Sequence, residues 1–467
     1  MNIGLNSLQN VIPKNDETIV AIATPSGRGG VGIVRVSGPL ALLIAAQLSQ
    51  RKSEHILPRK AIFSDFYFQS HVLDQGLLLY FPKPASFTGE DVVEFQVHGS
   101  PIVLDQIVRA SVALGARLAR PGEFSERAFL NGKMDLTQAE AIADLIHASS
   151  EQAARSALRS MEGVFSKQIA GILEQLIDIR MWIESSMDFA DEDIDFLQQG
   201  QLQAKIVTLT QVLEKILHVA SEAVLWTEGV TLVLAGFPNV GKSSLLNALV
   251  EKDAAIVTDI PGTTRDVIRE VFQWHGILVQ ILDTAGLRHT EDLVEQEGVR
   301  RTRQALMRAD LVCWVMDARE SVAEALRAVQ QVEGVQSHVP RLIVRNKVDL
   351  VKEIPALCWD EQTHIPIVSL SAQSGDGLAL LGEAFQKILN ISQQEPDFSA
   401  RTRHVEALKR VTAHVRTCAM ELHLSPPRLE CAAEELRMAQ QQLSEITGEF
   451  RSDDLLGRIF STFCIGK

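Results

Sequence analysis

The chain has 467 residues, of which 46 % are hydrophobic and 22 % are charged, and this length suggests roughly two to four domains. This balance of hydrophobic and charged residues excludes a collagenous, mucin-like or wholly disordered protein. The 45 basic and 59 acidic side chains give a net charge of −14. The chain as a whole therefore does not attract nucleic acid, and any RNA contact must come from a local basic patch or a partner.

Cysteine usage and the apolar runs indicate a cytoplasmic protein. The five cysteines are scattered and never form a CxxC pair, which favours a reducing compartment over a disulfide framework or a zinc site. The N-terminus has no basic leader ahead of an apolar stretch. The most apolar run has about ten residues, whereas a membrane span needs roughly twenty.

The first 130 residues are expected to form a mixed α/β domain. Residues 18–25, 31–38 and 91–99 are rich in β-branched side chains and are predicted to be strands. The pattern becomes helical from Thr137, which has the spacing of a capping box with Glu140. Helical spacing continues after Gly163, and a helix is also predicted over residues 202–226.

An acidic run interrupts these helices at residues 188–195, which hold five carboxylates and no basic side chain. It could be a metal-binding loop, but such runs are more often solvated turns. Residues 231–371 then alternate strands and loops. After a polar linker at 392–400 the chain is predicted to be helical to Phe463, with a break at Pro426-Pro427. The fold class is therefore α/β plus all-α.

A phosphate-binding loop is predicted directly after the strand that starts at Thr231. Gly236 and Gly241 enclose four residues and are followed by Lys242 and Ser243, the GxxxxGKS pattern. The glycines let backbone N–H groups curl around phosphate oxygens. Lys242 is expected to reach the β and γ phosphates and Ser243 to bind Mg²⁺.

Three further motifs each end a predicted strand. The run Asp283–Gly286 suits a contact with Mg²⁺ and the γ-phosphate. Asp349, in the motif Asn346-Lys347-Val348-Asp349, can accept two N–H groups of guanine, which adenine cannot offer as a pair. The backbone N–H groups of Ser371-Ala372 could meet the guanine carbonyl oxygen. Four motifs in this order predict a Ras-like P-loop GTPase domain, because open α/β sheets bind ligands at the strands' carboxyl ends.

One departure from small signalling GTPases concerns catalysis. Leu287 follows the Asp283–Gly286 motif where those proteins carry a water-orienting Gln. An aliphatic side chain cannot orient water, and no arginine finger can be assigned from spacing. Another cation and another polar group must therefore act.

The chain resembles the MnmE family of tRNA modification GTPases, also called TrmE, over essentially its whole length. The resemblance is carried by residues 259–266 (DIPGTTRD), 283–288 (DTAGLR), 121–146 and the ending 457–467 (GRIFSTFCIGK). It implies a tetrahydrofolate-binding and dimerisation domain at 1–130 and a helical domain built from 131–225 and 393–467. A GTPase domain would be inserted at 226–392.

The resemblance also implies the site residues. Potassium would be bound by the Asn239 side chain and by backbone oxygens of Thr258, Ile260 and Thr263, and Thr264 would join Ser243 on Mg²⁺. Glu295 would orient the attacking water, with Glu291 and Glu297 as close rivals. GTPase domains are expected to dimerise across the potassium loop. The full predicted GTP-binding set is Asn239, Val240, Gly241, Lys242, Ser243, Ser244, Thr258, Asp259, Ile260, Pro261, Gly262, Thr263, Thr264, Asp283, Thr284, Ala285, Gly286, Asn346, Lys347, Asp349, Ser371, Ala372 and Gln373.

A folate site is implied in the same way at Arg35, Glu94, Lys133 and Lys467. Basic groups suit the glutamate tail and pterin carbonyls, and a carboxylate suits the paired N–H donors of the pterin. Cys464 could be nucleophilic or merely buried beside the folate. The GRGGVG run at 27–32 lacks the following helix of a dinucleotide site.

The function implied by the resemblance is a potassium-dependent GTP hydrolase that acts as a homodimer with the FAD-dependent partner MnmG in a heterotetramer. Together they would add an aminomethyl or carboxymethylaminomethyl group to carbon 5 of the tRNA wobble uridine. The one-carbon donor would be methylene- or formyl-tetrahydrofolate.

Two other functions stay open at this point. One is a ribosome-assembly GTPase switch without modification chemistry, which would not need a folate site. The other is a folate-dependent one-carbon transferase whose GTPase domain is only regulatory. Two basic runs, at 300–308 and 401–416, either contact RNA or are solvated helix faces, which is the more common case.

Overall fold

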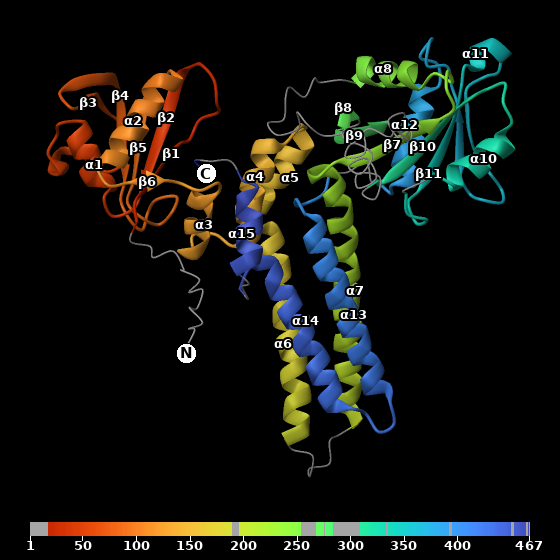
Figure 1. Ribbon diagram of the computed structural model, residues 1–467. Helices are drawn as coiled ribbons and strands as arrows, with labels where there is room; N and C mark the ends of the chain where they lie inside the picture. The colour runs from red at the N-terminus through yellow and green to blue at the C-terminus, as the bar shows by residue number, and fades with distance from the viewer. Residues whose placement is uncertain are drawn as a thin grey trace, which may run out of the picture. The chain divides into compact units, whose positions relative to one another are not determined.

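A computed structural model of the chain describes residues 17–188, 196–253, 268–274, 276–283, 309–332, 335–391, 395–449, 453–463 and 466. The chain divides into two compact units (Figure 1), one formed by residues 1–143 with 447–467 and the other by residues 144–446. In the described part of the chain, no helix is both long and apolar enough to cross a membrane.

The first unit is built on a six-stranded sheet with the order β3-β4-β5-β2-β1-β6. Its strands are β1 (Ile19–Ile22), β2 (Gly29–Ser37), β3 (Ile62–Phe68), β4 (His71–Phe81), β5 (Val92–Gly99) and β6 (Arg117–Leu118). All neighbours pair antiparallel except β1 and β6. The three strands predicted from sequence are confirmed as β1, β2 and β5. Residues 29–32 of the 27–32 run lie within β2, which pairs antiparallel with β5, so the run does not form a loop between a strand and a helix.

Helices α1 (Ala41–Leu48) and α2 (Pro101–Ala113) pack on this sheet. Alternating sheet residues such as Val34 and Phe95 share one buried cluster with Ile44 and Ile107 of the helices. A short 3₁₀ turn, η1 (Ser53–His55), follows α1. One face of the sheet is thus covered by helices, as alternating burial along β2 requires.

Both ends of the chain contribute to the remainder of this unit. Helices α3 (Glu123–Leu130), α4 (Leu136–His147) and α15 (Asp453–Ser461) meet in a cluster in which Phe129 and Leu136 pack with Phe460 and Phe463. The C-terminal helix therefore belongs to the N-terminal unit.

The predicted capping box at Thr137 and Glu140 is wrong, because α4 begins at Leu136 and is capped by Asp135. The Asp135 carboxylate accepts from Gln138 N at 3.0 Å, and Gln138 Oε1 accepts from Asp135 N at 3.0 Å. Aspartate is as good an N-cap as threonine. The side chains of Thr137 and Glu140 are instead buried.

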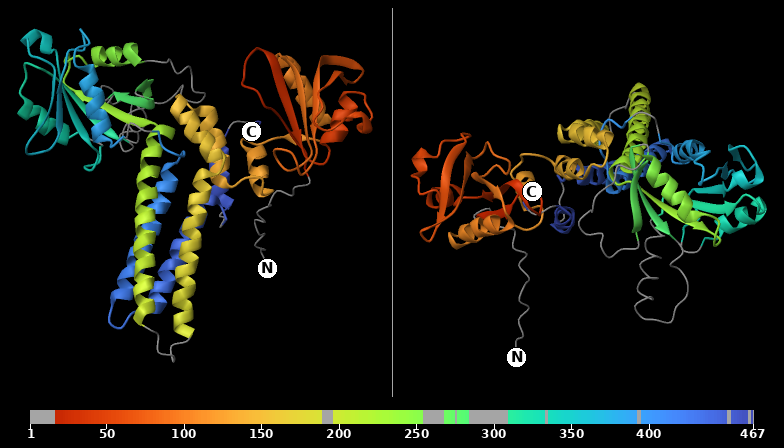
Figure 2. Two further views of the ribbon diagram at one scale, coloured as in Figure 1. Left: turned by 180° about the vertical axis from the view of Figure 1, so that it is seen from behind. Right: turned by 90° about the horizontal axis from the view of Figure 1, so that it is seen from above.

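The second unit contains a helical bundle (Figure 2). Its helices are α5 (Glu151–Met161), α6 (Val164–Asp188), α7 (Phe196–Thr227), α13 (Thr402–His423) and α14 (Leu429–Thr447). The last four are long, and their apolar stripes form one cluster with members such as Ile179, Leu209, Val411 and Leu436. The predicted helix at 202–226 and the break at Pro426-Pro427 are confirmed. The acidic run predicted as a turn or metal loop lies outside the described residues except for Asp188, the last residue of α6.

A seven-stranded sheet is inserted in sequence between α7 and α13, with the order β12-β13-β11-β10-β7-β9-β8. Its strands are β7 (Val230–Gly236), β8 (Ile268–Trp274), β9 (Ile277–Asp283), β10 (Leu311–Asp317), β11 (Arg341–Asn346), β12 (Ala356–Trp359) and β13 (Pro366–Ser369). The central five strands are parallel and the edge strands β8 and β12 are antiparallel. Glu228 follows α7 and accepts from Thr402 N at 2.9 Å, so the chain leaves the bundle and returns to it at neighbouring points.

Helices cover both faces of this sheet. They are α8 (Lys242–Asp253), α10 (Val322–Gln330) and α12 (Leu378–Ile388), and the short helix α11 (Val348–Val351) follows β11. Successive residues of β10 enter opposite clusters, with Cys313 packing with α8 and α12 and Val312 packing with α10. This is a doubly wound α/β domain, which confirms the predicted fold class of α/β plus all-α.

Candidate functional site

The loop between β7 and α8 has a backbone that only certain residues can adopt. Gly236 has a φ of +145°, and a Cβ on it would lie 2.2 Å from Val315 O. Gly241 has a φ of +96°, and a Cβ on it would lie 2.3 Å from Asn346 Nδ2. Asn239 has φ of +63°. The loop is therefore pressed against β10 and β11 with no space for a side chain at the glycines.

Lys242 opens α8 and lies across this loop. Its Nζ donates to the carbonyl oxygens of Gly236 and Phe237, each at 2.9 Å. Ser243 and Ser244 follow in the first turn of α8 and are exposed. A helix N-terminus with an adjacent ammonium and exposed hydroxyls suits a phosphate group and a Mg²⁺ ion bound to it.

Asn346, at the end of β11, joins three loops although it is 2 % exposed. Its Nδ2 donates to Val240 O at 3.0 Å, and its Oδ1 accepts from Lys347 N at 2.8 Å and from Ala372 N at 2.9 Å. This single amide connects the phosphate loop to both loops predicted to recognise guanine.

Lys347 makes a second connection, and Asp317 holds it. Lys347 Nζ donates to Asn239 O at 2.7 Å and lies 3.0 Å from Asp317 Oδ2. Asp317, at the end of β10, is 5 % exposed, and Arg319 Nη2 lies 2.7 Å from the same oxygen. The hydrogen bonds from Arg319 hold the pKa of Asp317 well below its usual range, so Asp317 stays ionised.

Asp317 is a site residue that sequence reasoning missed. The only signal is an Asp at the carboxyl end of a buried strand, next to the motif strand β11 in the sheet. Its partner Lys347 is thirty residues away in sequence, so no local motif joins them.

The predicted base-recognition residues lie on adjacent loops. Asp349 is exposed in the first turn of α11. The N–H groups predicted to meet guanine are bonded within the protein, Ser371 N to Asp376 O at 2.9 Å and Ala372 N to Asn346 Oδ1. Gln373 follows them on the same loop and is exposed. A guanine carbonyl would therefore share or replace the bond from Ala372 N.

Part of the predicted GTP site lies outside the described residues. This holds for Thr258, Asp259, Ile260, Pro261, Gly262, Thr263, Thr264, Thr284, Ala285, Gly286 and Glu295, and for the side chain of Asp283, which ends β9. The structure thus brings together Asn239–Ser244, Asn346–Asp349 and Ser371–Gln373 at the carboxyl edge of the parallel sheet.

A second predicted site, in the first unit, centres on Arg35 and Glu94. The two residues are directly opposite each other on β2 and β5. Arg35 Nε donates to Glu94 Oε1 at 2.9 Å, and Arg35 Nη1 donates to Gly466 O at 3.3 Å. The C-terminal segment therefore reaches the same point of the sheet as this ion pair.

Two aromatic rings lie within cation–π distance of the Arg35 guanidinium, and neither was predicted from sequence. Arg35 Cζ lies 5.6 Å from the centre of the Phe87 ring and 5.7 Å from that of Phe124. Cation–π contacts of this length hold a guanidinium in one orientation. Neither ring is close to Arg35 in sequence, so only the fold reveals them.

Lys133 contacts the loop that carries Phe87. Its Nζ donates to Pro84 O at 3.1 Å, and its side chain packs beside Gly89. Cys464 and Lys467 lie outside the described residues, although Gly466, which lies between them in sequence, is described. Three of the four predicted folate residues are thus placed, two in direct contact and the third on an adjoining loop.

The basic run at 401–416 is largely paired within the bundle. Arg401 lies 2.6 Å from Asp144, Arg416 lies 2.7 Å from Glu214, and Arg403 donates to Glu445 O at 3.3 Å. These contacts fit a helix face, and the alternative that the run contacts RNA stays a prediction. The run at 300–308 lies outside the described residues.

Comparison with known proteins gives matches along nearly the whole chain. A family model described as the MnmE helical domain matches residues 136–464, and one described as the GTP-binding protein TrmE N-terminus matches residues 18–133. A tRNA modification GTPase MnmE of Coxiella burnetii is 49 % identical over 453 residues, 97 % of this chain and 99 % of that protein. Proteins of the same description from Legionella pneumophila (strain Corby) and Nitrosococcus oceani are each 51 % identical, over 97 % of this chain and 99 % and 97 % of their own lengths.

Proposed function

Because the chain belongs to the MnmE family of tRNA modification GTPases and is a GTP hydrolase, we propose that it couples potassium-dependent GTP hydrolysis to modification of the tRNA wobble uridine. It would work in the cytoplasm as a homodimer, with an FAD-dependent partner, MnmG, in a heterotetramer. The group added to carbon 5 would be aminomethyl or carboxymethylaminomethyl, and a tetrahydrofolate derivative would donate the one-carbon unit.

The observation that carries the nucleotide part is the Asn346 side chain, which bonds the phosphate loop and both base-recognition loops. One buried amide thereby sets the distance between the phosphate end and the base end of a bound nucleotide. Lys242 would neutralise charge on the β and γ phosphates. Asp349 would accept the two guanine N–H groups, and Ser243 with Thr264 would hold Mg²⁺.

Potassium fits the donors that the loop after β7 offers. The Asn239 amide oxygen is a neutral ligand of the kind a large monovalent cation takes, and backbone oxygens of Thr258, Ile260 and Thr263 would complete the set. Lys347 Nζ holds Asn239 O at 2.7 Å and so fixes the left-handed backbone from which the side chain projects. When bound, the ion would supply the positive charge that an arginine finger supplies elsewhere.

The folate part rests on the Arg35–Glu94 pair. Glu94 would accept the paired N–H donors of a pterin, and Arg35, Lys133 and Lys467 would contact its carbonyl groups or the glutamate tail. Arg35 is oriented by Glu94, Gly466 O and two aromatic rings, so its guanidinium is positioned by the fold.

The domain assignment is also part of the proposal. Residues 1–130 would bind folate and dimerise, 131–225 with 393–467 would form the helical domain, and 226–392 would hydrolyse GTP. Of the proposed helical domain, residues 131–143 and 447–467 belong to the first compact unit. The insertion of the GTPase domain between α7 and α13 supports a transfer of nucleotide-driven motion to the helices.

The decisive experiment is mass spectrometry of wobble uridines in tRNA from a strain that lacks this chain. We expect the carbon-5 group to be lost and to be restored by the wild-type gene but not by Lys242→Ala. Unchanged modification in the deletion strain would overturn the proposal. A measurement of folate binding by the purified protein distinguishes this proposal from the alternative of a ribosome-assembly switch, which needs no folate.

A further inference from the structure

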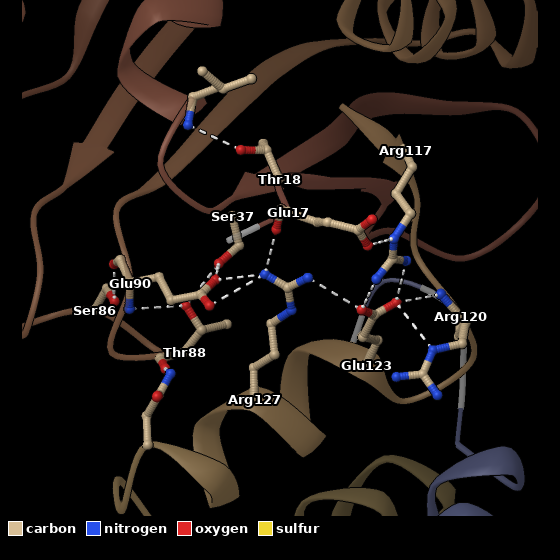
Figure 3. Close-up of polar contacts among 12 residues, drawn as sticks. Glu17, Thr18, Ser37, Ser86, Thr88, Glu90, Arg117, Arg120, Glu123 and Arg127 are labelled. Atoms are coloured by element: carbon tan, nitrogen blue, oxygen red, sulfur yellow. Dashed lines mark hydrogen bonds and ion pairs between the residues drawn. The ribbon is translucent and has the colours of Figure 1, made fainter. Parts of the chain in front are cut away.

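A buried ion network lies beside the Arg35 site in the first unit (Figure 3). It joins helix α3, strand β6, the end of β2 and the loop of residues 82–91 between β4 and β5. Its central carboxylate, Glu123, is 1 % exposed, and its central guanidinium, Arg127, is 4 % exposed. Charged groups this deeply buried need an explanation, because removing them from water costs free energy.

Arg127 bridges the loop and the helix. Its Nη1 donates to the Glu90 carboxylate at 3.0 and 3.1 Å and to Glu17 O at 2.8 Å, and its Nη2 donates to Glu123 Oε1 at 3.2 Å. Glu123 is held in turn by Arg117, with Nη2 at 2.6 Å from the same oxygen. Glu90 belongs to the loop, whereas Glu123 and Arg127 belong to α3.

A chain of hydroxyl groups attaches the same loop to β2. The Thr88 and Ser37 hydroxyl oxygens are 2.7 Å apart, and Ser37 Oγ donates to Glu90 Oε2 at 2.7 Å. Thr88 and Ser37 are both fully buried. Figure 3 shows that the Glu90 carboxylate lies between these hydroxyl groups and the Arg127 guanidinium.

The two elements that this network joins also carry the rings around Arg35. Phe87 precedes Thr88 on the loop, and Phe124 follows Glu123 on α3. Arg35 lies on β2 two residues before Ser37. Five residues of the network are thus within three residues of Arg35 or of one of the two rings, namely Ser37, Thr88, Glu90, Glu123 and Arg127.

We propose that Glu90 and Arg127 are positioning residues of the folate site, whose ion pair holds the Phe87 and Phe124 rings beside Arg35. The inference rests on the proposed folate function. A buried ion pair contributes little net stability compared with apolar residues of the same volume. Here it fixes one register between loop and helix, which apolar contacts, being non-directional, do not.

The test replaces Glu90 by Gln, which keeps the shape and one acceptor but removes the charge that Arg127 meets. The matched control is Glu126→Gln. Glu126 lies on α3, the helix that carries Arg127, and it pairs with Arg120 at 2.8 Å. Its side chain is 14 % exposed, against 12 % for Glu90. Thr88→Val is the second variant, because it loosens the loop without leaving a buried charge unpaired.

Two measurements are made on the full chain, namely affinity for 5-formyltetrahydrofolate by calorimetry and amide hydrogen exchange of peptides covering residues 84–91. We expect Glu90→Gln to bind at least about tenfold more weakly and Thr88→Val about threefold, with faster exchange in the loop in both. Glu126→Gln should match the wild type, and GTP hydrolysis should be unchanged in all three.

Wild-type affinity in both Glu90→Gln and Thr88→Val would overturn the inference, as would an equal loss in Glu126→Gln. If the wild-type protein itself binds no folate derivative, the proposed folate function fails. The exchange measurement then still decides the positioning role, since unchanged exchange of residues 84–91 in Glu90→Gln would contradict it.

Discussion

Asn346 Nδ2 donates to Val240 O at 3.0 Å, so a residue of the predicted guanine-recognition motif bonds directly to the predicted phosphate loop. Its carbonyl oxygen accepts two further backbone N–H groups, from Lys347 and Ala372. The phosphate loop and the base-recognition loops therefore share one buried side chain, and a disturbance of either end of the site reaches the other through it.

Asn346→Ala should destabilise the GTPase domain and weaken nucleotide binding together. Three backbone groups, two of them in buried hydrogen bonds, would lose their partner, which is expected to lower the free energy of unfolding by about 3 kcal/mol. Denaturant unfolding and a fluorescent GDP analogue measure the two effects. Gln362→Ala, an exposed amide of the same domain, should change stability by less than about 0.5 kcal/mol. A stable variant with normal affinity would contradict this role for Asn346.

Asn239 offers a clean test of the potassium proposal, because its φ of +63° suits glycine. Asn239→Gly removes the amide oxygen and keeps the backbone that Lys347 holds, whereas Ala would add strain. Hydrolysis in potassium should fall at least about tenfold, to the rate that the wild type shows in sodium. Rates are measured by phosphate release in matched salts. Equal wild-type rates in potassium and sodium would refute the proposal.

Glu295→Ala should slow GTP hydrolysis by about a hundredfold and leave GTP affinity within about twofold of the wild type. The reason is that a water-orienting carboxylate acts in the chemical step and does not hold the nucleotide. Glu291→Ala and Glu297→Ala are controls of the same charge in the same segment. A large loss of affinity would show that Glu295 has a structural role, and a loss of rate in Glu291→Ala alone would move the role to that residue.

Asp349→Asn should change the preferred base. The amide reverses one hydrogen-bond direction, so guanine loses one charge-assisted bond and its affinity should fall about ten- to a hundredfold. Xanthine, which has a carbonyl where guanine has the exocyclic amine, should gain affinity. Competition between GTP and XTP for the purified protein measures the change. Unaltered selectivity would show that Asp349 does not contact the base.

The ionised Glu123 carboxylate should make the stability of the first unit sensitive to acid. Burial alone would raise its pKa, but hydrogen bonds from Arg117 and from Arg120 N outweigh burial and lower the pKa from 4.5 to about 2. The folded pKa is depressed, so the ionised group stabilises the fold above pH 4.5 and this contribution is lost as the pH falls towards 2.

Glu123→Gln should therefore cost about 2 kcal/mol at neutral pH, and its difference from the wild type should shrink as the pH falls from 4.5 to about 2. Hydrogen exchange of peptides from α3 reports this stability. Glu151→Gln, which removes an exposed carboxylate, should show no such pH dependence. A constant difference between Glu123→Gln and the wild type at every pH would argue against the ion network as its cause.

The motifs that the structure describes lie together at one edge of the parallel sheet, because each motif is contiguous and ends a strand. The role of Asp317 could not be predicted from the sequence, because it depends on Lys347, which follows the neighbouring strand β11. Phe87 and Phe124 were missed for the same reason, as their contact with Arg35 exists only in the folded unit.

Errors in the predicted elements also have physical causes. The spacing of Thr137 and Glu140 matches a capping box, but Asp135 with Gln138 forms one two residues earlier and the helix begins there. Strands β3 and β4 were not predicted individually. Buried and partly exposed residues of β4 do not alternate strictly, and Gly76 interrupts its apolar pattern.

The contact of Phe129 and Leu136 with Phe460 and Phe463 has a consequence for biosynthesis. The ribosome releases the sheet of the first unit early, but the helix that covers these apolar side chains emerges more than three hundred residues later. At roughly 5–20 residues per second, this surface stays uncovered for tens of seconds. The nascent chain should therefore depend on chaperones until α15 has docked, and it gains a native N-terminal unit only after translation has passed both the bundle and the GTPase domain.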